Sequence, residues 1–334
     1  MTHDFAKTGL HIDLRAQVMP MKALRRLAAE VASQGHNVLV LEWEGTFPFE
    51  KHAIISNRYA YTRKEIVRFI DDCTRCGLEV IPLQQCFGHL EYILQHKRYA
   101  HLRESQTDLC QLCPCKIDDA LEVFSEIFRE MAALHPSGCF HIGGDETYLL
   151  GHCPACRARA EEHGKSRLYT DFFCRMAKEV IALGKRPMLW IDMLLKYPES
   201  ASEMPAESIF VDWNYGWPLD RFGDFDRLRE MPFEFWGAPA MRSGPDNHST
   251  FSWRGHFENL RDYIPAARAM NFRGMVLTSW STSGMYGYDW DTHGEVAGLL
   301  PIRRVYPHAG LPILSAAFTE AVKSEAPLNV ARFI

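Results

Sequence analysis

Residues 139–146 read CFHIGGDE, a short apolar strand followed by two glycines and two adjacent carboxylates. Charge at the end of a buried strand costs free energy unless it is compensated, so the pair Asp145 and Glu146 indicates chemistry. Because the two acids are neighbours, their side chains leave the backbone in different directions and can reach two atoms of one ligand. The structural alternative is that Asp145 caps the following helix and Glu146 lies in its first turn.

Outward from this stretch, eight short apolar runs rich in β-forming residues alternate with amphipathic helical patterns. The runs are 9–14, 37–43, 78–83, 139–142, 187–191, 208–213, 233–236 and 274–280, and the clearest helical patterns are 20–35, 62–77, 118–134 and 166–183. Such alternation predicts parallel strands joined by crossover helices, and eight strands close a barrel.

We therefore predict an α/β fold, a (β/α)8 TIM barrel that forms a single domain over residues 1–334 with insertions in the loops at its C-terminal face. The alternative is an open, doubly wound sheet. A glycine-rich phosphate loop after the first strand, which is typical of that fold, is absent from the sequence.

The composition limits the possible partners. Hydrophobic residues make up 47%, charged residues 24%, and the net charge is −5 without a basic run, so the pattern expected of a nucleic-acid binder is missing. The N-terminus lacks an apolar signal region, and no run approaches the ~18 apolar residues of a membrane span. We expect a cytoplasmic protein without a nucleic-acid or membrane partner, and the sequence is compatible with a homo-oligomer.

Acids and tryptophans gather at the predicted strand ends. Trp190, Trp213, Trp236 and Trp280 end four consecutive strands, although barrel interiors are normally filled by branched aliphatic residues. A single tryptophan would more often belong to the core, but four beside carboxylates are typical of a sugar site, because the C–H faces of a pyranose pack on aromatic rings.

The stretch HIGGDE at 141–146 resembles the H-x-G-G-D-E signature of glycoside hydrolase family 20, the β-N-acetylhexosaminidases. The similarity extends along most of the chain to the short, single-domain hexosaminidase D-like branch. The supporting stretches are HIDLR at 11–15, EWEGTFPFE at 42–50, YAY at 59–61, CFGHLE at 86–91, WIDM at 190–193 and DWNY at 212–215. The family is a (β/α)8 barrel, which agrees with the strand count.

The resemblance implies substrate-assisted retention, in which the 2-acetamido oxygen of the substrate attacks C1 and water opens the resulting oxazolinium ion. Glu146 would be the general acid and base, and Asp145 would accept the acetamide N–H. His89 matches a buried histidine that supports the glutamate; its acid partner in the family is usually an aspartate after the second strand, where the nearest acids here are Glu42 and Glu44. No cofactor is required for this reaction.

The resemblance also implies a substrate-binding set. Trp190, Trp213 and Trp280 match positions that wall the acetamide pocket, and Tyr215 is the candidate donor to the acetamide oxygen. The remaining members of the predicted set are Arg15, His141 and Asp192. Thr8 and Thr282 replace an arginine and a glutamate of the larger family, so Arg15 or Arg242 would substitute in binding the sugar hydroxyls.

The cysteines form a second group with zinc-knuckle spacing. Cys110 and Cys113 precede a further Pro-Cys pair, and Cys153 and Cys156 begin seven residues after Glu146. One interpretation is a structural zinc held by Cys110, Cys113, Cys153 and Cys156, with Cys115 able to replace Cys110 or Cys113. Unligated thiols or a disulfide are the other interpretation.

The sequence therefore predicts an exo-acting β-N-acetylhexosaminidase that releases terminal β-linked GlcNAc or GalNAc from small glycosides or oligosaccharides. A metal-dependent barrel hydrolase is one alternative. A non-catalytic amino-sugar-binding barrel is another, and the intact pair Asp145 and Glu146 counts against it.

Overall fold

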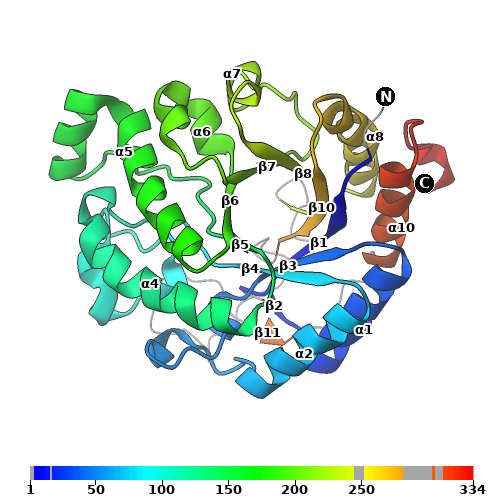
Figure 1. Ribbon diagram of the computed structural model, residues 1–334, viewed down its shortest axis with the longest axis horizontal. Coiled ribbons are helices and arrows are strands. Elements are labelled where there is room, and N and C mark those ends of the chain that lie inside the picture. Colours follow the sequence, from blue (N-terminus) through cyan, green and yellow to red (C-terminus); the bar gives the residue numbers. More distant parts are fainter. Residues whose placement is uncertain (1–3, 16, 244–251, 281–302, 305–310, 334) are drawn as a thin grey trace.

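The structure is a computed structural model that describes residues 4–15, 17–243, 252–280, 303–304 and 311–333. Eight parallel strands pair in chain order, and β1 also pairs with β10, which closes a barrel (Figure 1). The barrel strands are β1 (Lys7–Asp13), β3 (Val38–Glu42), β4 (Glu79–Leu83), β5 (Cys139–His141), β6 (Arg186–Trp190), β7 (Ile209–Trp213), β8 (Glu234–Ala238) and β10 (Gly274–Ser279). The predicted (β/α)8 fold is confirmed; whether all of residues 1–334 form one domain stays a prediction.

Helices surround the barrel (Figure 1). They are α1 (Met21–Ser33), α2 (Arg63–Arg75), α3 (Glu91–Leu94), α4 (Ile117–Leu134), α5 (Pro154–Ala182), α6 (Asp192–Lys196), α7 (Asp226–Arg229), α8 (Trp253–Ala269) and α10 (Leu311–Lys323). The 3-10 helices are η1 (Glu44–Thr46), η2 (Ala53–Ile55), η3 (Lys97–Leu102), η4 (Pro114–Lys116), η5 (Pro198–Glu203) and η7 (Val330–Arg332), and the short strands are β2 (Gln17–Val18), β9 (Ala240–Arg242) and β11 (Arg303–Arg304).

Helix α2 begins and ends where the sequence predicts. Thr62 and Glu65 form a capping box: the Thr62 hydroxyl accepts the Glu65 N–H at 3.2 Å, and the Glu65 carboxylate accepts the Thr62 N–H at 2.8 Å. Helix α5 differs from the prediction because it starts earlier, at Pro154, and is broken at Gly164, where φ is 84° and ψ is 156°.

Alternation along the strands separates two cores. On β3, Leu39 and Leu41 pack with the helices, whereas Val38 and Val40 belong to the cluster inside the barrel. At the C-terminal end the interior becomes polar, since Glu42 is fully buried there. The barrel therefore has an apolar base beneath a layer of charged and polar side chains.

Trp236 is part of the barrel core and not of the C-terminal face. It pairs with Gly274 at the start of β10, and a Cβ on Gly274 would lie 2.2 Å from the Trp236 ring. The prediction that Trp236 ends its strand is wrong, because β8 continues to Ala238.

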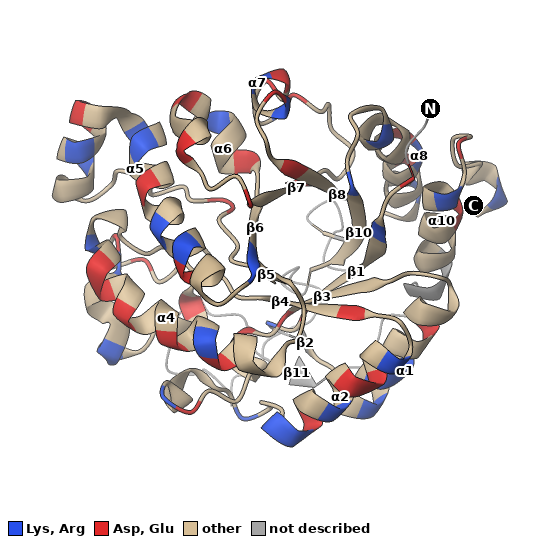
Figure 2. Ribbon diagram, in the orientation of Figure 1, with Lys and Arg blue, Asp and Glu red and all other residues tan. Residues whose placement is uncertain are grey.

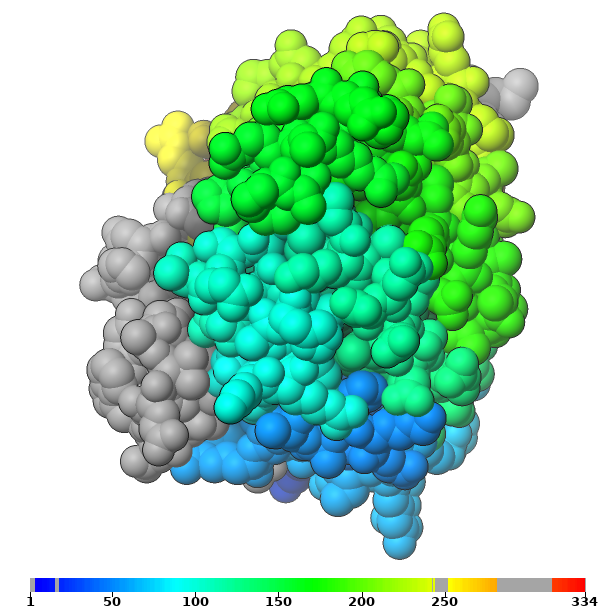
Figure 3. Space-filling view, turned by 90° about the vertical axis from the view of Figure 1, so that its left-hand side faces the viewer, coloured from blue at the N-terminus to red at the C-terminus, as the bar shows by residue number. Residues whose placement is uncertain are grey.

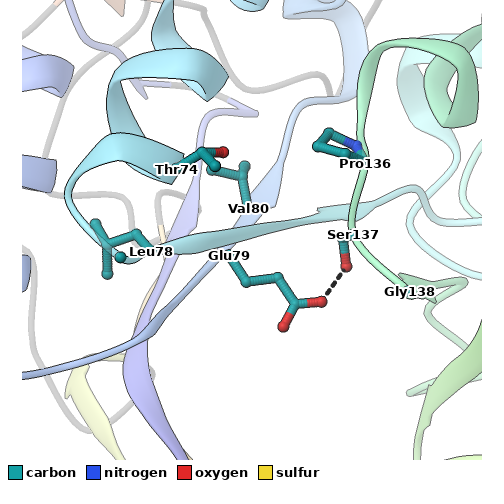
Figure 4. Close-up of a pocket in the computed structure, with 8 residues that line it drawn as sticks. Thr74, Leu78, Glu79, Val80, Pro136, Ser137 and Gly138 are labelled. Carbon is teal, nitrogen blue, oxygen red and sulfur yellow. Dashed lines mark hydrogen bonds between the residues drawn. The ribbon is translucent and has the colours of Figure 1, made fainter.

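The N-terminal face carries a pocket between the start of β4 and the chain that enters β5 (Figure 4). Its polar group is Glu79, which accepts a hydrogen bond from Ser137 at 2.6 Å and pairs with Lys7 at 2.7 Å. Since Glu79 is already satisfied and lies at the far end of the barrel from Asp145, this pocket is separate from the predicted site.

Lys/Arg and Asp/Glu residues are interspersed along the outer helices α1, α2, α4 and α5 (Figure 2). None of the helices within the described residues is both long and apolar enough to cross a membrane.

Asp212 provides a test of the packing between β7 and α8. Its carboxylate accepts a hydrogen bond from Tyr263 at 2.7 Å, and burial raises the pKa of Asp212 from 3.8 to about 7 despite this bond. Between these values the folded state holds a proton that the unfolded state has lost, so this contribution to stability falls as pH rises from about 4 to about 7.

We predict that Asp212→Asn removes this pH dependence. Between pH 5 and pH 8 the wild type should lose on the order of 1–3 kcal/mol more unfolding free energy than the variant, as measured by urea denaturation. Asp220→Asn, at an exposed position, should behave as the wild type. Parallel pH profiles for the wild type and Asp212→Asn would contradict the burial of this carboxyl.

Candidate active site

The two glycines before the carboxylates allow a turn that no other residue would permit. Gly143 has φ +73°, and a Cβ there would lie 1.7 Å from the Gln85 amide oxygen. Gly144 has φ +106°, and its Cβ would lie 2.9 Å from the hydroxyl of Tyr169, which donates to the Gly144 carbonyl at 3.0 Å. Strand β5 can therefore end against β4 and α5, and the next two residues enter the mouth of the barrel.

His89 lies between the two carboxylates. Its Nε2 atom is 3.2 Å from Asp145 Oδ2 and 3.5 Å from Glu146 Oε2. Gly88 permits this approach, because a Cβ there would lie 2.9 Å from the Asp145 carbonyl oxygen. The Asp145 side chain is 8% exposed and the Glu146 side chain 34% exposed. One carboxylate is thus enclosed, while the other reaches the open space of the site.

The charges of His89 and Asp145 compensate each other. Burial alone would lower the pKa of His89, but the charge of Asp145 and its hydrogen bond outweigh burial and raise the His89 pKa well above 6.5. Burial likewise would raise the pKa of Asp145, but the charge of His89 holds it below 3.8. An imidazolium and a carboxylate therefore form the buried part of the site at neutral pH.

Gln85 connects Asp145 to the barrel interior. Its amide nitrogen donates to Asp145 Oδ1 and to Glu42 Oε1, each at 3.3 Å. Glu42 in turn lies 3.2 Å from His11 Nε2 and 3.2 Å from an Arg15 guanidinium nitrogen. Burial would raise the pKa of Glu42, but Arg15 and His11 lower it to about 2.

Arg15 contacts acids instead of open space. Its guanidinium pairs with Glu42, with Glu44 at 3.4 Å and with Asp13 at 3.7 Å, and its side chain is only 13% exposed. Burial raises the pKa of Glu44 well above 4.5. Arg15 therefore balances the charge of the carboxylates behind Asp145, and its predicted role in binding sugar hydroxyls stays a prediction.

Asp192 and Tyr148 hold Glu146 from two sides. Asp192 accepts the backbone N–H of Glu146 at 3.1 Å and the indole N–H of Trp213 at 3.2 Å. Tyr148, which no pattern in the sequence indicated, donates its hydroxyl to Glu146 Oε1 at 2.6 Å. Burial and then the charge of Asp145 raise the pKa of Asp192 to about 7. Asp192 thus positions Glu146 and Trp213, and only 5% of it is exposed to solvent.

Aromatic rings line the site from β6 to β10. The Trp190 and Trp280 rings lie 5.5 Å apart, and the Trp213 and Tyr215 rings 5.3 Å apart. Trp280 donates its indole N–H to the Tyr215 hydroxyl at 2.5 Å, which joins the two pairs. Trp213, Tyr215 and Trp280 are half-buried and Trp190 is fully buried. The first three present partly open rings, and Trp190 lies beneath them.

His141 is buried next to Trp190. Its Nδ1 accepts the Gly143 N–H at 3.0 Å, and its ring lies 4.5 Å from that of Trp190. Burial lowers the His141 pKa to about 3, so the ring is neutral. His141 is 1% exposed and fixes the turn at Gly143, and its predicted substrate-binding role stays a prediction.

Thr8 is not part of the site. Thr8 bonds His36 at 3.0 Å at the N-terminal end of the barrel, so an arginine there would not reach the site. Thr282 and the Arg242 side chain lie outside the described residues.

Three of the four predicted cysteine ligands come together, and Glu104 takes the place of Cys110. The sulfur atoms of Cys113, Cys153 and Cys156 come together with the carboxylate of Glu104. Cys110 is not in this cluster, because its sulfur accepts the backbone N–H of His89 at 3.4 Å. No pattern in the sequence indicated Glu104, whereas Gln85, directly after a buried strand, had the same signal as the other strand-end residues.

A family model described as glycosyl hydrolase family 20, catalytic domain, matches residues 15–217. The chain belongs to this family. It is a glycoside hydrolase, and the predicted membership is confirmed. Hexosaminidase D of Bos taurus is 29% identical over 96% of this chain and 93% of its own length.

Two solved structures share the fold. The chitobiase of Flavobacterium johnsoniae superposes with a TM-score of 0.71 at 20% identity, over 98% of this chain and 50% of that one. The N-acetyl-beta-hexosaminidase of Streptomyces plicatus, in complex with Thio-NAglucal, has a TM-score of 0.63 at 20% identity over 84% of this chain and 60% of that one. This chain thus spans about half to three fifths of those solved chains.

We predict that Gly143→Ala destabilises the protein by about 1–3 kcal/mol and slows turnover, because the new methyl group displaces Gln85 from Asp145. Urea denaturation and initial rates measure the two effects. Gly138→Ala, directly before β5 with no atom within 4 Å of the added Cβ, is the matched control and should stay within about 0.5 kcal/mol of the wild type. Equal behaviour of both variants would contradict the close approach of Gln85.

Proposed function

We propose that this glycoside hydrolase is an exo-acting β-N-acetylhexosaminidase that releases terminal β-linked GlcNAc or GalNAc from small glycosides or oligosaccharides, with retention of configuration. The observation that carries the proposal is that His89 contacts two carboxyl groups in different environments: Asp145 is enclosed and held as an anion, whereas Glu146 is partly exposed. Two adjacent carboxyl groups in different environments are what a two-role acid site needs.

In the first step the acetamide oxygen of the substrate forms a bond to C1 while the bond between C1 and the leaving oxygen breaks. Glu146 donates its proton to that oxygen, and Asp145 accepts the acetamide N–H and stabilises the positive charge of the oxazolinium ion. In the second step water attacks C1, Glu146 takes a proton from the water, and the acetamide oxygen leaves C1. The substrate supplies the nucleophile and Glu146 the proton, so the reaction needs no cofactor.

The aromatic residues would bind the acetamide group. Trp213 and Trp280 offer half-buried indole faces above Trp190, and such faces suit both a methyl group and the C–H face of a pyranose. The Tyr215 oxygen accepts the indole N–H of Trp280, which orients the hydroxyl of Tyr215. These contacts support Tyr215 as the donor to the acetamide oxygen.

The alternative of a metal-dependent hydrolase has one observation in its favour. The ligand atoms of His89, Asp145 and Glu146 lie within 4.8 Å of one another and could surround an ion. A metal-bound imidazole must present an unprotonated nitrogen. The His89 pKa lies well above 6.5, and the same nitrogen faces both carboxylates as a donor, which favours the glycosidase. The cytoplasmic location and the homo-oligomer stay predictions from the sequence.

Replacing the 2-acetamido group of the substrate by hydroxyl tests the nucleophile. We predict that aryl β-GlcNAc or β-GalNAc is hydrolysed at least about 10³ times faster than the matching β-glucoside, because the glucoside has no intramolecular nucleophile. A thiazoline mimic of the cyclised intermediate should inhibit far more strongly than free GlcNAc. The measurement is the initial rate of hydrolysis of each N-acetylated substrate and of its matching β-glucoside. Comparable rates would refute substrate assistance.

Glu146→Gln should lower turnover of substrates with poor leaving groups by ~10²- to 10⁴-fold and should spare, in part, those with activated phenols. The reason is that a good leaving group departs with little protonation. Glu161→Gln, at an exposed position of α5, is the control and should keep full activity on both. If Glu146→Gln loses the same factor on both classes of substrate, Glu146 is not the general acid.

A further inference from the structure

Three cysteines and a glutamate form an enclosed cluster beside the site. Cys113 Sγ lies 3.4 Å from Cys156 Sγ and 3.7 Å from Cys153 Sγ. Cys113 is 1% exposed, Cys156 is 0% exposed and Glu104 is 4% exposed. Their ligand atoms all lie within 4.8 Å of one another. These four side chains are called the thiol cluster below.

The spacing of the sulfur atoms suits a shared ion better than a covalent bond. A disulfide joins its sulfurs at about 2.05 Å, and no two cysteines of the thiol cluster approach so closely in the structure. Zinc binds cysteine sulfur at about 2.3 Å, so two ligands at adjacent corners of a tetrahedron are about 3.8 Å apart. The separation of Cys113 and Cys153, 3.7 Å, matches that edge, and 3.4 Å for Cys113 and Cys156 lies slightly below it.

Backbone N–H groups face the sulfur atoms of the thiol cluster. Cys153 is the residue that precedes the first turn of α5, and its sulfur accepts the backbone N–H of Cys156 at 3.4 Å. The backbone N–H of Cys115 faces the sulfurs of Cys113 and Cys156. Backbone donors and the positive end of a helix stabilise negative sulfur.

The two carboxylate oxygens of Glu104 make different contacts in the thiol cluster. Its Oε1 accepts the backbone N–H of Cys153 at 2.7 Å, whereas Oε2 lies 3.3 Å from Cys156 Sγ. A carboxylate that binds an ion through one oxygen can keep its backbone bond through the other. Such a fixed orientation is typical of metal-binding carboxylates.

We propose that Cys113, Cys153, Cys156 and Glu104 bind a structural zinc ion. The three thiols release their protons to solvent when they bind it, and the fourth position is filled by a Glu104 oxygen, which leaves no position for substrate. The proposal is independent of the proposed function, since none of the four residues contacts Asp145 or Glu146 among the interactions of the described residues.

The ion would join two segments that carry the site. Glu104 and Cys113 lie in the segment between β4 and α4 that also holds His89, and Cys153 follows Glu146 on the way from β5 to α5. These segments abut on one face of the molecule, cyan against green in Figure 3, and Gln111 accepts the Leu149 N–H at 2.8 Å between them. The zinc would thus fix the relative positions of the segments that carry His89 and Glu146, while lying outside the reaction centre.

Metal analysis of the full chain tests the proposal directly. Protein purified under reducing conditions without added metal should contain about one zinc per chain. The thiols of Cys113, Cys153 and Cys156 should resist alkylation until a zinc chelator is added, and Co²⁺ in place of zinc should give sulfur-to-cobalt charge-transfer absorption. Zinc near zero with the three thiols freely alkylated, or a mass two daltons lower from a disulfide, would overturn the proposal.

Variants identify the ligands. Cys153→Ser should lose the zinc and lower Tm, whereas Cys76→Ser, at an exposed cysteine outside the cluster, should change neither. Cys110→Ser should retain the zinc, because Cys110 contacts His89. Glu104→Gln should reduce zinc occupancy and Cys115→Ser should not; the opposite result for this last pair would overturn Glu104 as the fourth ligand.

Discussion

The site depends on one electrostatic constraint: two adjacent carboxylates at the end of a buried strand need a cation between them. His89 supplies it, with Nε2 3.2 Å from Asp145 and 3.5 Å from Glu146. Without that charge, the enclosed Asp145 would favour its protonated form, because desolvation penalises the anion. The conformation of the neighbouring backbone serves this contact, since His89 and Glu146 both have φ near +50° (55° and 49°).

In the polar layer of the barrel, buried acids are likewise paired with positively charged or hydrogen-bonding side chains. Asp145 is connected through Gln85 to Glu42, and Glu42 is balanced by Arg15 and His11. Arg15 therefore balances the buried acids at the C-terminal end of the barrel. On the opposite side, Asp192 and Tyr148 fix the backbone and the side chain of Glu146. Apart from His89, which contacts both, the two carboxylates thus have different supporting residues.

Much of the fold could be predicted from the sequence because its signals are local. The eight strands and the capping box of Thr62 and Glu65 follow from short-range periodicity and from neighbouring residues. That Asp145 and Glu146 are neighbours can likewise be read directly from the sequence. Each of these features needs contacts over only a few positions.

The remaining features depend on packing between distant segments. The partner of His89 is Asp145, 56 positions away, instead of an acid after the second strand. Glu104 joins the thiol cluster in place of Cys110 because the turn at Cys110 aims its sulfur at the backbone of His89. Trp236 lies in the core because β8 extends beyond it. Spacing along the chain does not report these directions, since they follow from how loops fold over the barrel.

The protonation state of His89 tests the account most directly. A ¹⁵N NMR titration of its imidazole, assigned by comparison with His89→Gln, should give a pKa well above the ordinary 6.5, and the value should fall in Asp145→Asn because the compensating anion is gone. A His89 pKa at or below 6.5 in the wild type, unchanged in Asp145→Asn, would contradict the ion pair on which the site is built.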